Sequence, residues 1–246
     1  MKHSNQSRES VIILKNVSKQ YVIHHEKPTL VEKFYKGADE KFWALNKISL
    51  TIKKGERVGI IGPNGSGKTT LLKVISGITS PSSGSVTTRG KVVSLIDLEA
   101  GFHPDLTGYQ NIFLNGMIIG MSKSDILKKL QNIISYAELD QFIDTPLFTY
   151  SQGMKLRLGF AITIHSEPDI IILDENLSVG DQYFQGKAVD TINTLVRKNR
   201  VTLVYVSHSL LTLRHLCTKI FWLQKGLIFR SGNTSLLTAY LQKYTD

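Results

Sequence analysis

The sequence predicts an α/β protein built on a parallel sheet that is buried on both faces. Three observations predict this class. Largely apolar runs occupy residues 58–61, 170–173 and 201–206, a helix pattern follows the first run at 68–77, and glycines are concentrated between that run and that helix. Continuous apolar runs, rather than alternating ones, are typical of parallel strands covered on both sides. With 246 residues the chain is long enough to bury a large core.

The composition is that of a globular protein and indicates an anionic partner. Hydrophobic residues make up 41% of the chain, and 30 Lys and Arg face 20 Asp and Glu, which gives a formal charge of +10. Nucleic acid, anionic lipid headgroups and nucleotide phosphates would all suit that charge. The single cysteine, Cys217, fits a reducing compartment. Because no apolar run approaches about 18 residues, we expect a cytosolic chain, alone or docked.

The stretch GPNGSGKTT at residues 62–70 lies between a predicted strand and a predicted helix. In that context the pattern G-x-x-x-x-G-K-[ST] predicts a phosphate-binding loop (P-loop). Its glycines let backbone N–H groups point inward, and the helix N-terminus adds a positive dipole end. Lys68 is expected to reach the β and γ phosphates, and Thr69 to ligate Mg²⁺. The predicted nucleotide-binding residues of the loop are Gly62, Asn64, Gly65, Ser66, Gly67, Lys68, Thr69 and Thr70.

Two further predicted strands end in polar residues suited to ATP hydrolysis. The run PDIIILDE (168–175) ends in Asp174, expected to hold Mg²⁺, and Glu175, expected to orient and deprotonate the attacking water. The run VTLVYVSH (201–208) ends in His208, expected to contact the γ-phosphate. Lys68, Glu175 and His208 are therefore the predicted catalytic residues, and Thr69 and Asp174 the predicted metal ligands.

Five motifs in order resemble the ATP-binding subunits of ABC transporters: GPNGSGKT, YSQGMKLRLGFA (150–161), IIILDE, LSVGD (177–181) and VSH (206–208). The resemblance implies a P-loop NTPase core of the RecA-like type, an antiparallel β-subdomain and an inserted helical subdomain. It also implies a homodimer in which each ATP lies between the P-loop of one copy and the YSQGM signature motif of the other. Ser151, Gly153 and Asp181 are the expected contributors from that side.

We expect a single domain over residues 10–246. Residues 10–98 and 166–230 form the core with its antiparallel subdomain, 99–165 the helical subdomain, and 231–246 a short tail. An S-x-x-D start at Ser122 and Asp125 precedes one predicted apolar helix face, made by Ile126, Leu127, Leu130, Ile133 and Ile134. The resemblance implies that a polytopic permease dimer docks beside residues 98–116.

Two departures from the usual family pattern narrow the resemblance. The signature reads YSQGM (150–154) where Leu-Ser-Gly-Gly-Gln is usual, and residues 94–108 lack the usual glutamine, with Glu99 or Asp97 as candidate replacements. With LEAGFHPDLTGYQNI and LSVGDQYFQGKA, these features resemble the ATPases that export lipid-linked polysaccharides: O-antigen, capsule and teichoic acid. The chain is then expected at the cytoplasmic face of the membrane, as a peripheral subunit. Cargo recognition is expected elsewhere, because the tail after Gly232 is brief.

An aromatic residue is expected to stack on the adenine. Tyr21, after the first strand, is the first candidate, and Trp43 is the alternative. Between Tyr21 and the next predicted strand lies an insertion (22–43) with a predicted cationic amphipathic helix capped by Thr29, which would suit a headgroup surface. The resemblance to the exporters implies that this insertion acts as a gate near the membrane.

Other classes of ATPase fit the sequence less well. Another export system or a nucleic-acid-linked ATPase of the same superfamily remains the alternative, and the charge would suit the second. DNA-repair and chromosome ATPases insert long heptad coiled coils, which are absent from this sequence. Translation-factor ATPases need two cassettes in one chain, and this sequence contains one set of motifs. The motifs YSQGM and VSH are not expected in a soluble kinase or GTPase. We therefore expect no nucleic-acid partner.

Overall fold

The computed structural model describes residues 9–23, 40–96, 98–174, 181–198, 201–207 and 209–245. Its strands are β1 (Ser10–Ile23), β2 (Glu40–Lys53), β3 (Arg57–Ile61), β4 (Ser83–Thr88), β5 (Val92–Ser94), β6 (Ile170–Leu173), β7 (Thr202–Val206), β8 (Lys219–Gln224) and β9 (Leu227–Gly232). Its helices are α1 (Lys68–Ile75), α2 (Gly108–Ile118), α3 (Lys123–Ala137), α4 (Gln152–His165), α5 (Gln182–Lys198), α6 (Leu210–Leu216) and α7 (Leu236–Thr245), with a short 3-10 helix at Leu147–Thr149.

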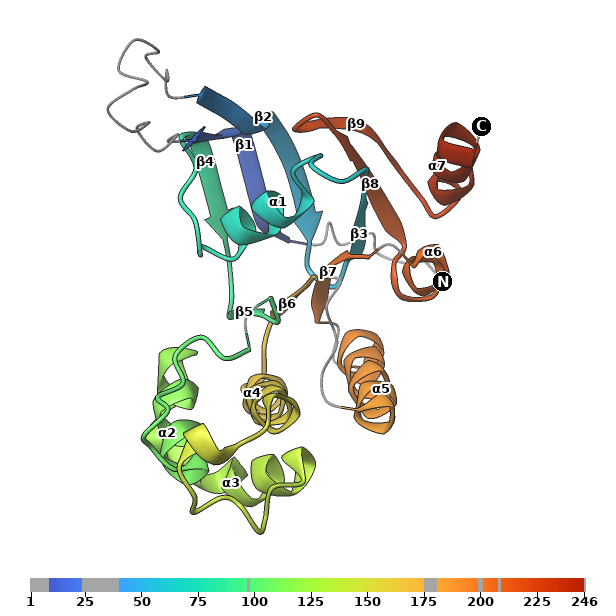
Figure 1. Ribbon diagram of the computed structural model, residues 1–246. Helices are drawn as coiled ribbons and strands as arrows, with labels where there is room; N and C mark the ends of the chain where they lie inside the picture. Colours follow the sequence, from blue (N-terminus) through green and yellow to red (C-terminus); the bar gives the residue numbers. More distant parts are fainter. Residues whose placement is uncertain are drawn as a thin grey trace, which may run out of the picture.

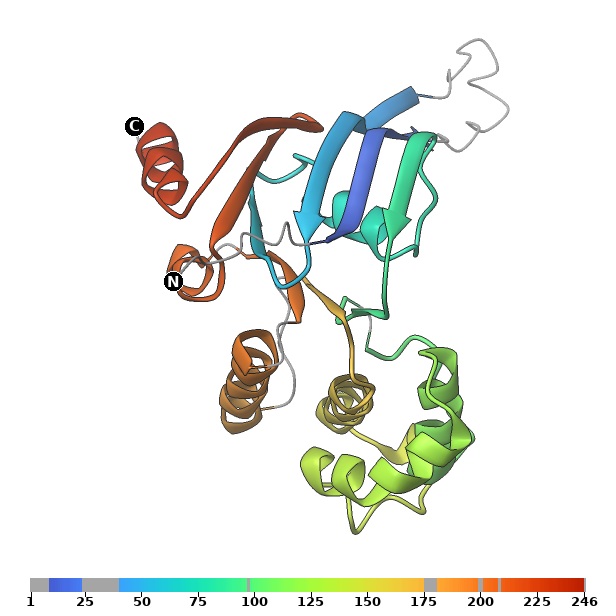
Figure 2. The same cartoon turned by 180° about the vertical axis from the view of Figure 1, so that it is seen from behind.

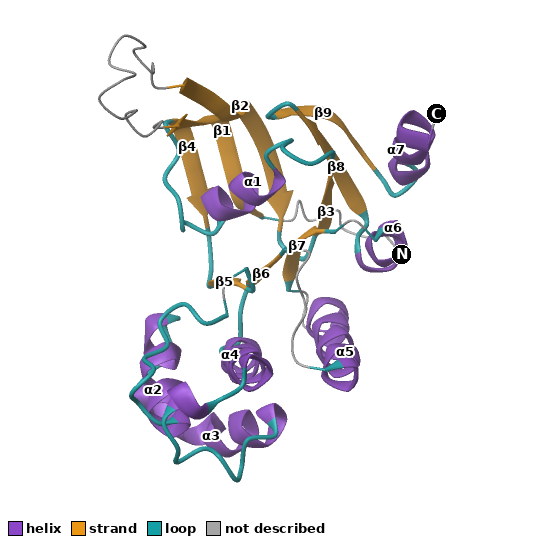
Figure 3. Cartoon of the chain, viewed as in Figure 1, coloured by secondary structure: helices purple, strands orange, loops and turns teal. Residues whose placement is uncertain are grey.

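The strands form two sheets (Figures 1 and 3). The larger sheet has the order β5-β6-β7-β3-β8-β9, in which the first five strands are parallel and β9 pairs antiparallel with β8. The smaller sheet, β2-β1-β4, is antiparallel. The predicted α/β class, with a P-loop core and an antiparallel subdomain, is confirmed.

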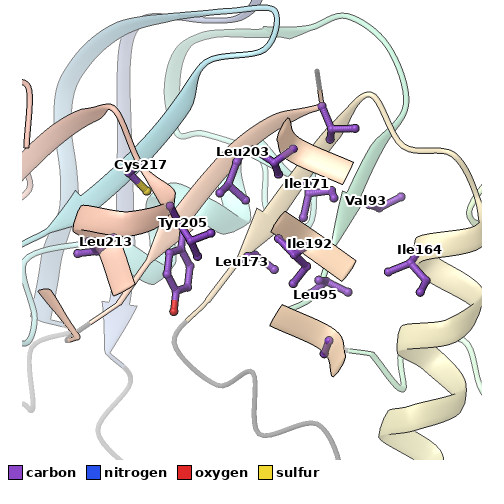
Figure 4. Packing of buried hydrophobic residues seen from close by; sticks show 14 of the residues in the cluster. Val93, Leu95, Ile164, Ile171, Leu173, Ile192, Leu203, Tyr205, Leu213 and Cys217 are labelled. Carbon is purple, nitrogen blue, oxygen red and sulfur yellow. The ribbon is translucent and has the colours of Figure 1, made fainter. Parts of the chain in front are cut away.

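The central parallel strands are buried on both faces, which explains their continuous apolar sequence. Ile170 and Ile172 of β6 pack with α1 and the antiparallel sheet, whereas Ile171 and Leu173 pack on the opposite side. On that second side, Figure 4 shows side chains from α4, α5 and α6 meeting the sheet, among them Ile164, Ile192 and Leu213. Successive strand residues point to opposite faces, so each strand supplies both cores.

Helices α2 and α3 stand away from the two sheets and form a lobe with one side of α4, whereas the other side of α4 packs on the larger sheet (Figures 1 and 2). Helix α3 begins as predicted, because Ser122 is its N-cap and the Ser122 Oγ accepts a hydrogen bond from the Asp125 N–H at 3.1 Å. Ile126 and Ile133 are fully buried in the lobe, but Leu127 is 52% exposed. The expectation for Leu127 was wrong: Ile134, at nearly the same angle around α3 but two turns later, is buried, so the lobe covers this side of the helix only toward its C-terminal end.

Strands β1 and β2 extend into the predicted insertion. Their pairing continues to Ile23 opposite Glu40, so both ends of residues 22–43 are strand. Residues 24–39, including the predicted helix capped by Thr29, lie outside the described residues.

The C-terminal segment ends in α7, which is part of the core. The Tyr240 ring of α7 packs against Trp222 of β8, with ring centroids 5.1 Å apart. Within the described ranges, no helix combines the length and the apolar character needed to cross a membrane.

Candidate nucleotide-binding site

The glycine-rich loop leaves β3 and enters α1, as predicted from the sequence. Gly67 caps α1 with φ of +101°, a backbone conformation that L side chains rarely adopt. A Cβ on Gly67 would come closer than 3.0 Å to the carbonyl oxygen of Ala44, and one on Gly62 would come as close to that of Leu223. Glycine is therefore required at both positions, because neighbouring backbone fills the space of a side chain.

The loop borders a hollow of about 400 Å³ beside the N-terminus of α1. Its other walls come from β2, through Phe42 and Ala44, from Asp174 after β6, and from Val206 at the end of β7. Backbone N–H groups and the positive end of a helix dipole favour an anion at such a place. The predicted loop residues that line the hollow are Asn64, Gly65, Ser66, Gly67, Lys68, Thr69 and Thr70.

The side chains of the loop fit a polyphosphate. Lys68 is 8% exposed, and its ammonium donates to the carbonyl oxygens of Gly62 at 2.8 Å and Pro63 at 3.1 Å. These contacts hold a positive charge within the loop. The Ser66 Oγ is buried and has no hydrogen-bond partner in the described structure. A buried, unsatisfied hydroxyl costs free energy, so a phosphate oxygen is a suitable partner for it.

Thr69 and Asp174 line the same hollow although they come from different elements. Their oxygen atoms are ligands of the kind that Mg²⁺ prefers, and Mg²⁺ is commonly held by one or two protein groups together with phosphate oxygens and water. The described residues hold no group of three or more His, Cys, Asp or Glu placed for a metal ion. The residues at the hollow therefore fit a Mg²⁺ ion that arrives with a nucleotide.

The aromatic residue that lines the hollow is Phe42, which sequence reasoning missed. Tyr21 is not among the lining residues, but it is the cross-strand partner of Phe42, so their side chains share one face of the β1–β2 pair. Lys19 lies over the Tyr21 ring at 5.2 Å. Trp43, the alternative stacker, follows Phe42 and therefore points to the other face. Because side chains alternate between the two faces of a strand, the sequence could have shown that Phe42 and Trp43 point to opposite faces.

The signature motif lies at the start of α4, in the lobe. Ser151 is the N-cap, and its Oγ accepts the Met154 N–H at 3.2 Å, while Gly153 is in the first turn. Neither residue lines the P-loop hollow. Asp181 is also placed at a helix start, because its Oδ1 accepts the Phe184 N–H of α5 at 2.9 Å.

The remaining predicted residues are placed as follows. Glu175, His208 and Asp97 lie outside the described residues. Glu99 does not line the P-loop hollow, but accepts a hydrogen bond from Gln152 of the signature motif.

The phosphate loop, the carboxylate after β6 and the parallel sheet together define a P-loop nucleotide-binding ATPase, and the antiparallel sheet and three-helix lobe are those of an ATP-binding cassette. The protein-family model described as "ABC transporter" matches residues 45–178. The chain belongs to the ABC transporter family and is an ABC-type ATPase.

Known relatives agree with this assignment. The O-antigen export system ATP-binding protein RfbB of Klebsiella pneumoniae is 40% identical over 92% of this chain and 94% of its own length. The teichoic acids export ATP-binding protein TagH of Listeria monocytogenes is 41% identical over 96% of this chain and 70% of its own length. The RfbB of Myxococcus xanthus is 46% identical over 80% of this chain, which spans 45% of that relative.

A solved structure agrees with the fold. The ATP-binding cassette MJ0796, in a dimeric post-hydrolysis state bound to ADP and Pi, has a TM-score of 0.71 and 26% identity. The match covers 91% of this chain and 98% of that cassette.

Proposed function

We propose that this chain is the ATP-hydrolysing subunit of an exporter that moves a lipid-linked polysaccharide across the cytoplasmic membrane. O-antigen, capsule and teichoic acid are the cargo class. The observation that carries this proposal is the 40% identity to an O-antigen export ATP-binding protein over nearly the full length of both chains. The replaced signature and the missing glutamine, which resemble the same exporters, support it.

In this proposal the residues around the hollow bind and orient ATP. The loop N–H groups and Lys68 hold the β and γ phosphates, and Phe42 and Tyr21 offer aromatic faces to the adenine. Thr69 and Asp174 hold Mg²⁺, which when bound neutralises charge on the transferred phosphate. Glu175 takes the proton of the attacking water, and His208 contacts the γ-phosphate.

The second half of each ATP site comes from another copy of the chain. The Ser151 hydroxyl and the first amide groups of α4 meet the γ-phosphate bound by the partner copy, and Asp181 lies at the same interface. Two observations support this arrangement. Ser151 and Gly153 do not line the hollow of their own chain, and the relative MJ0796 forms a dimer bound to ADP and Pi.

A permease dimer docks on the lobe at α2. Tyr109, Met117 and Ile118 of this helix are 39%, 51% and 61% exposed. Met117 and Ile118 are adjacent at the C-terminal end of α2, and large apolar side chains exposed side by side are typical of a protein interface. This contact holds the chain at the cytoplasmic face of the membrane as a peripheral subunit.

The test is co-expression with a candidate permease subunit of a polysaccharide exporter. We expect the parent chain to sediment with membranes only when the permease is present. Replacement of both Met117 and Ile118 by Glu should abolish that sedimentation while the isolated chain keeps its ATPase rate. Leu127→Glu is the matched control, because Leu127 is a similarly exposed apolar residue on α3 of the same lobe.

Two results would count against the export function. Sedimentation of the double variant at the parent level would contradict docking on α2. Binding of DNA by the parent chain, with no membrane recruitment, would favour the nucleic-acid-linked alternative.

A further inference from the structure

The segment 98–101, which connects the core to the lobe, is fastened to the lobe by close packing. Gly159, in the middle of α4, lies so near Leu98 that a Cβ on the glycine would come closer than 3.0 Å to the Leu98 carbonyl oxygen. From α2, the Asn115 Nδ2 donates to the Ala100 carbonyl at 2.9 Å, and Asn115 is 4% exposed. The backbone of the segment is therefore held at two points: it packs closely against α4 at Leu98, and it accepts a hydrogen bond from α2 at Ala100.

A third attachment joins two residues that depart from the usual family pattern. The Gln152 Nε2 donates a hydrogen bond to Glu99 Oε1. Gln152 is the first residue of α4, directly after the N-cap Ser151, and stands where the usual signature has glycine. Glu99 lies in the stretch that lacks the usual glutamine. The bond is charge-assisted, and such bonds are stronger than neutral ones.

We propose that Glu99 is a positioning residue for the nucleotide reaction, acting through Gln152. It holds the first turn of α4, and so fixes Ser151 relative to segment 98–101. It also places a negative charge beside the helix N-terminus that receives the γ-phosphate of the partner copy. The effect on ATP rests on the proposed function, whereas the hold on α4 does not.

The charge and the hydrogen bond act in opposite directions on ATP. A carboxylate near the N-terminus of a helix is stabilised by the helix dipole, but it repels an incoming phosphate. The hydrogen bond keeps the serine and the first amide groups in place for that phosphate. Glu99→Gln separates the two effects, because its amide oxygen still accepts from Gln152 and its charge is gone.

The hold on α4 is tested in the nucleotide-free protein by amide hydrogen exchange. The informative amides are those of Phe102, which donates to the Glu99 carbonyl at 2.9 Å, and Met154, which donates to the Ser151 Oγ at 3.2 Å. We expect Gln152→Ala to speed their exchange by roughly threefold or more, because the hydrogen bond from Gln152 to Glu99 is lost. Glu99→Gln should stay within about twofold of the parent.

The control variant is Gln141→Ala. It makes the same substitution in the same lobe, at an exposed position between α3 and the 3-10 helix, and should leave both amides unchanged. Parent-like exchange of Phe102 and Met154 in Gln152→Ala would overturn the positioning role.

The effect on nucleotide is tested by ATPase kinetics at low salt. Gln152→Ala should raise the KM for ATP by roughly three- to tenfold with little change in kcat, as expected for one lost charge-assisted hydrogen bond. Glu99→Gln should lower the KM by about two- to fivefold, because the exposed charge near the helix end is removed. A KM raised by Glu99→Gln as far as by Gln152→Ala would overturn the charge assignment.

A third variant separates this inference from the function on which it rests. Ser151→Ala should raise the KM for ATP. If it keeps the parent KM, the shared ATP site is wrong, and the exchange comparison still decides whether Glu99 holds α4.

Discussion

Replacing Gly159 by alanine should destabilise the protein, although the same change in most helices is stabilising. Gly159 lies inside α4, where alanine is favoured over glycine by about 1 kcal/mol. At this position, however, the new methyl group would meet the Leu98 carbonyl at less than 3.0 Å, a separation that real Cβ atoms essentially never show. The close approach involves backbone, which cannot rotate away as a flexible side chain would.

The magnitude follows from the two opposing effects. Overpacking a tight contact costs about 1–3 kcal/mol, and a backbone partner favours the upper end. After the propensity gain of about 1 kcal/mol, the net loss in the free energy of unfolding is about 2 kcal/mol. For a chain of this size that loss lowers Tm by about 4–8 °C.

Gly186→Ala is the matched control, since Gly186 lies inside α5 and a Cβ there would meet nothing within 4 Å. It should raise the free energy of unfolding by about 0.5–1 kcal/mol, and Tm by about 1–4 °C. Thermal unfolding followed by circular dichroism, with urea unfolding alongside, compares both variants with the parent. If Gly159→Ala is as stabilising as Gly186→Ala, segment 98–101 does not pack on α4 as described.

Three further predictions concern single side chains. Lys68→Ala should weaken binding of a fluorescent ATP analogue by roughly tenfold or more, because a charged hydrogen-bond donor is lost; an unchanged Kd would contradict the P-loop role. Burial lowers the pKa of His165 below 6.5, so the unfolded chain binds a proton more readily than the folded chain. The free energy of unfolding should therefore fall as pH drops from 7 to 5, and fall less in His165→Gln; equal slopes in urea unfolding would refute this. Burial raises the pKa of the Cys217 thiol to about 12, so a thiol reagent at pH 8 should label it in urea but not in the native protein, and rapid native labelling would be the contrary result.

Local sequence was sufficient for the parts of the fold that have strong local causes. The buried strands β3, β6 and β7 are continuous apolar runs because both their faces are covered, and the run itself carries that information. The P-loop was equally clear, since its glycine pattern lies between a predicted strand and a predicted helix and glycine suits the positive φ of Gly67. Ser122 as an N-cap followed from its residue type before a helical pattern.

Features that depend on tertiary approach were not predictable in the same way. The choice of Phe42 over Tyr21 at the hollow depends on the register of β1 against β2, which contains several shifts. The meeting of Glu99 and Gln152 joins residues 53 positions apart, and no periodicity records it. Residues 231–246 were expected only as a short tail, but they contain α7. The Tyr240 ring of this helix packs on Trp222, and that contact exists only in the folded chain.

The central claim is that two copies of this chain enclose ATP between the P-loop of one and the signature motif of the other. The most direct measurement is the molar mass of the Glu175→Gln variant by light scattering, with and without ATP and Mg²⁺. Slowed hydrolysis, by about a hundredfold or more, should preserve the ATP-bound state. The account predicts a monomer without nucleotide and a dimer carrying two ATP molecules with it, and Ser151→Ala should weaken that dimer. A chain saturated with ATP that stays monomeric would contradict the account.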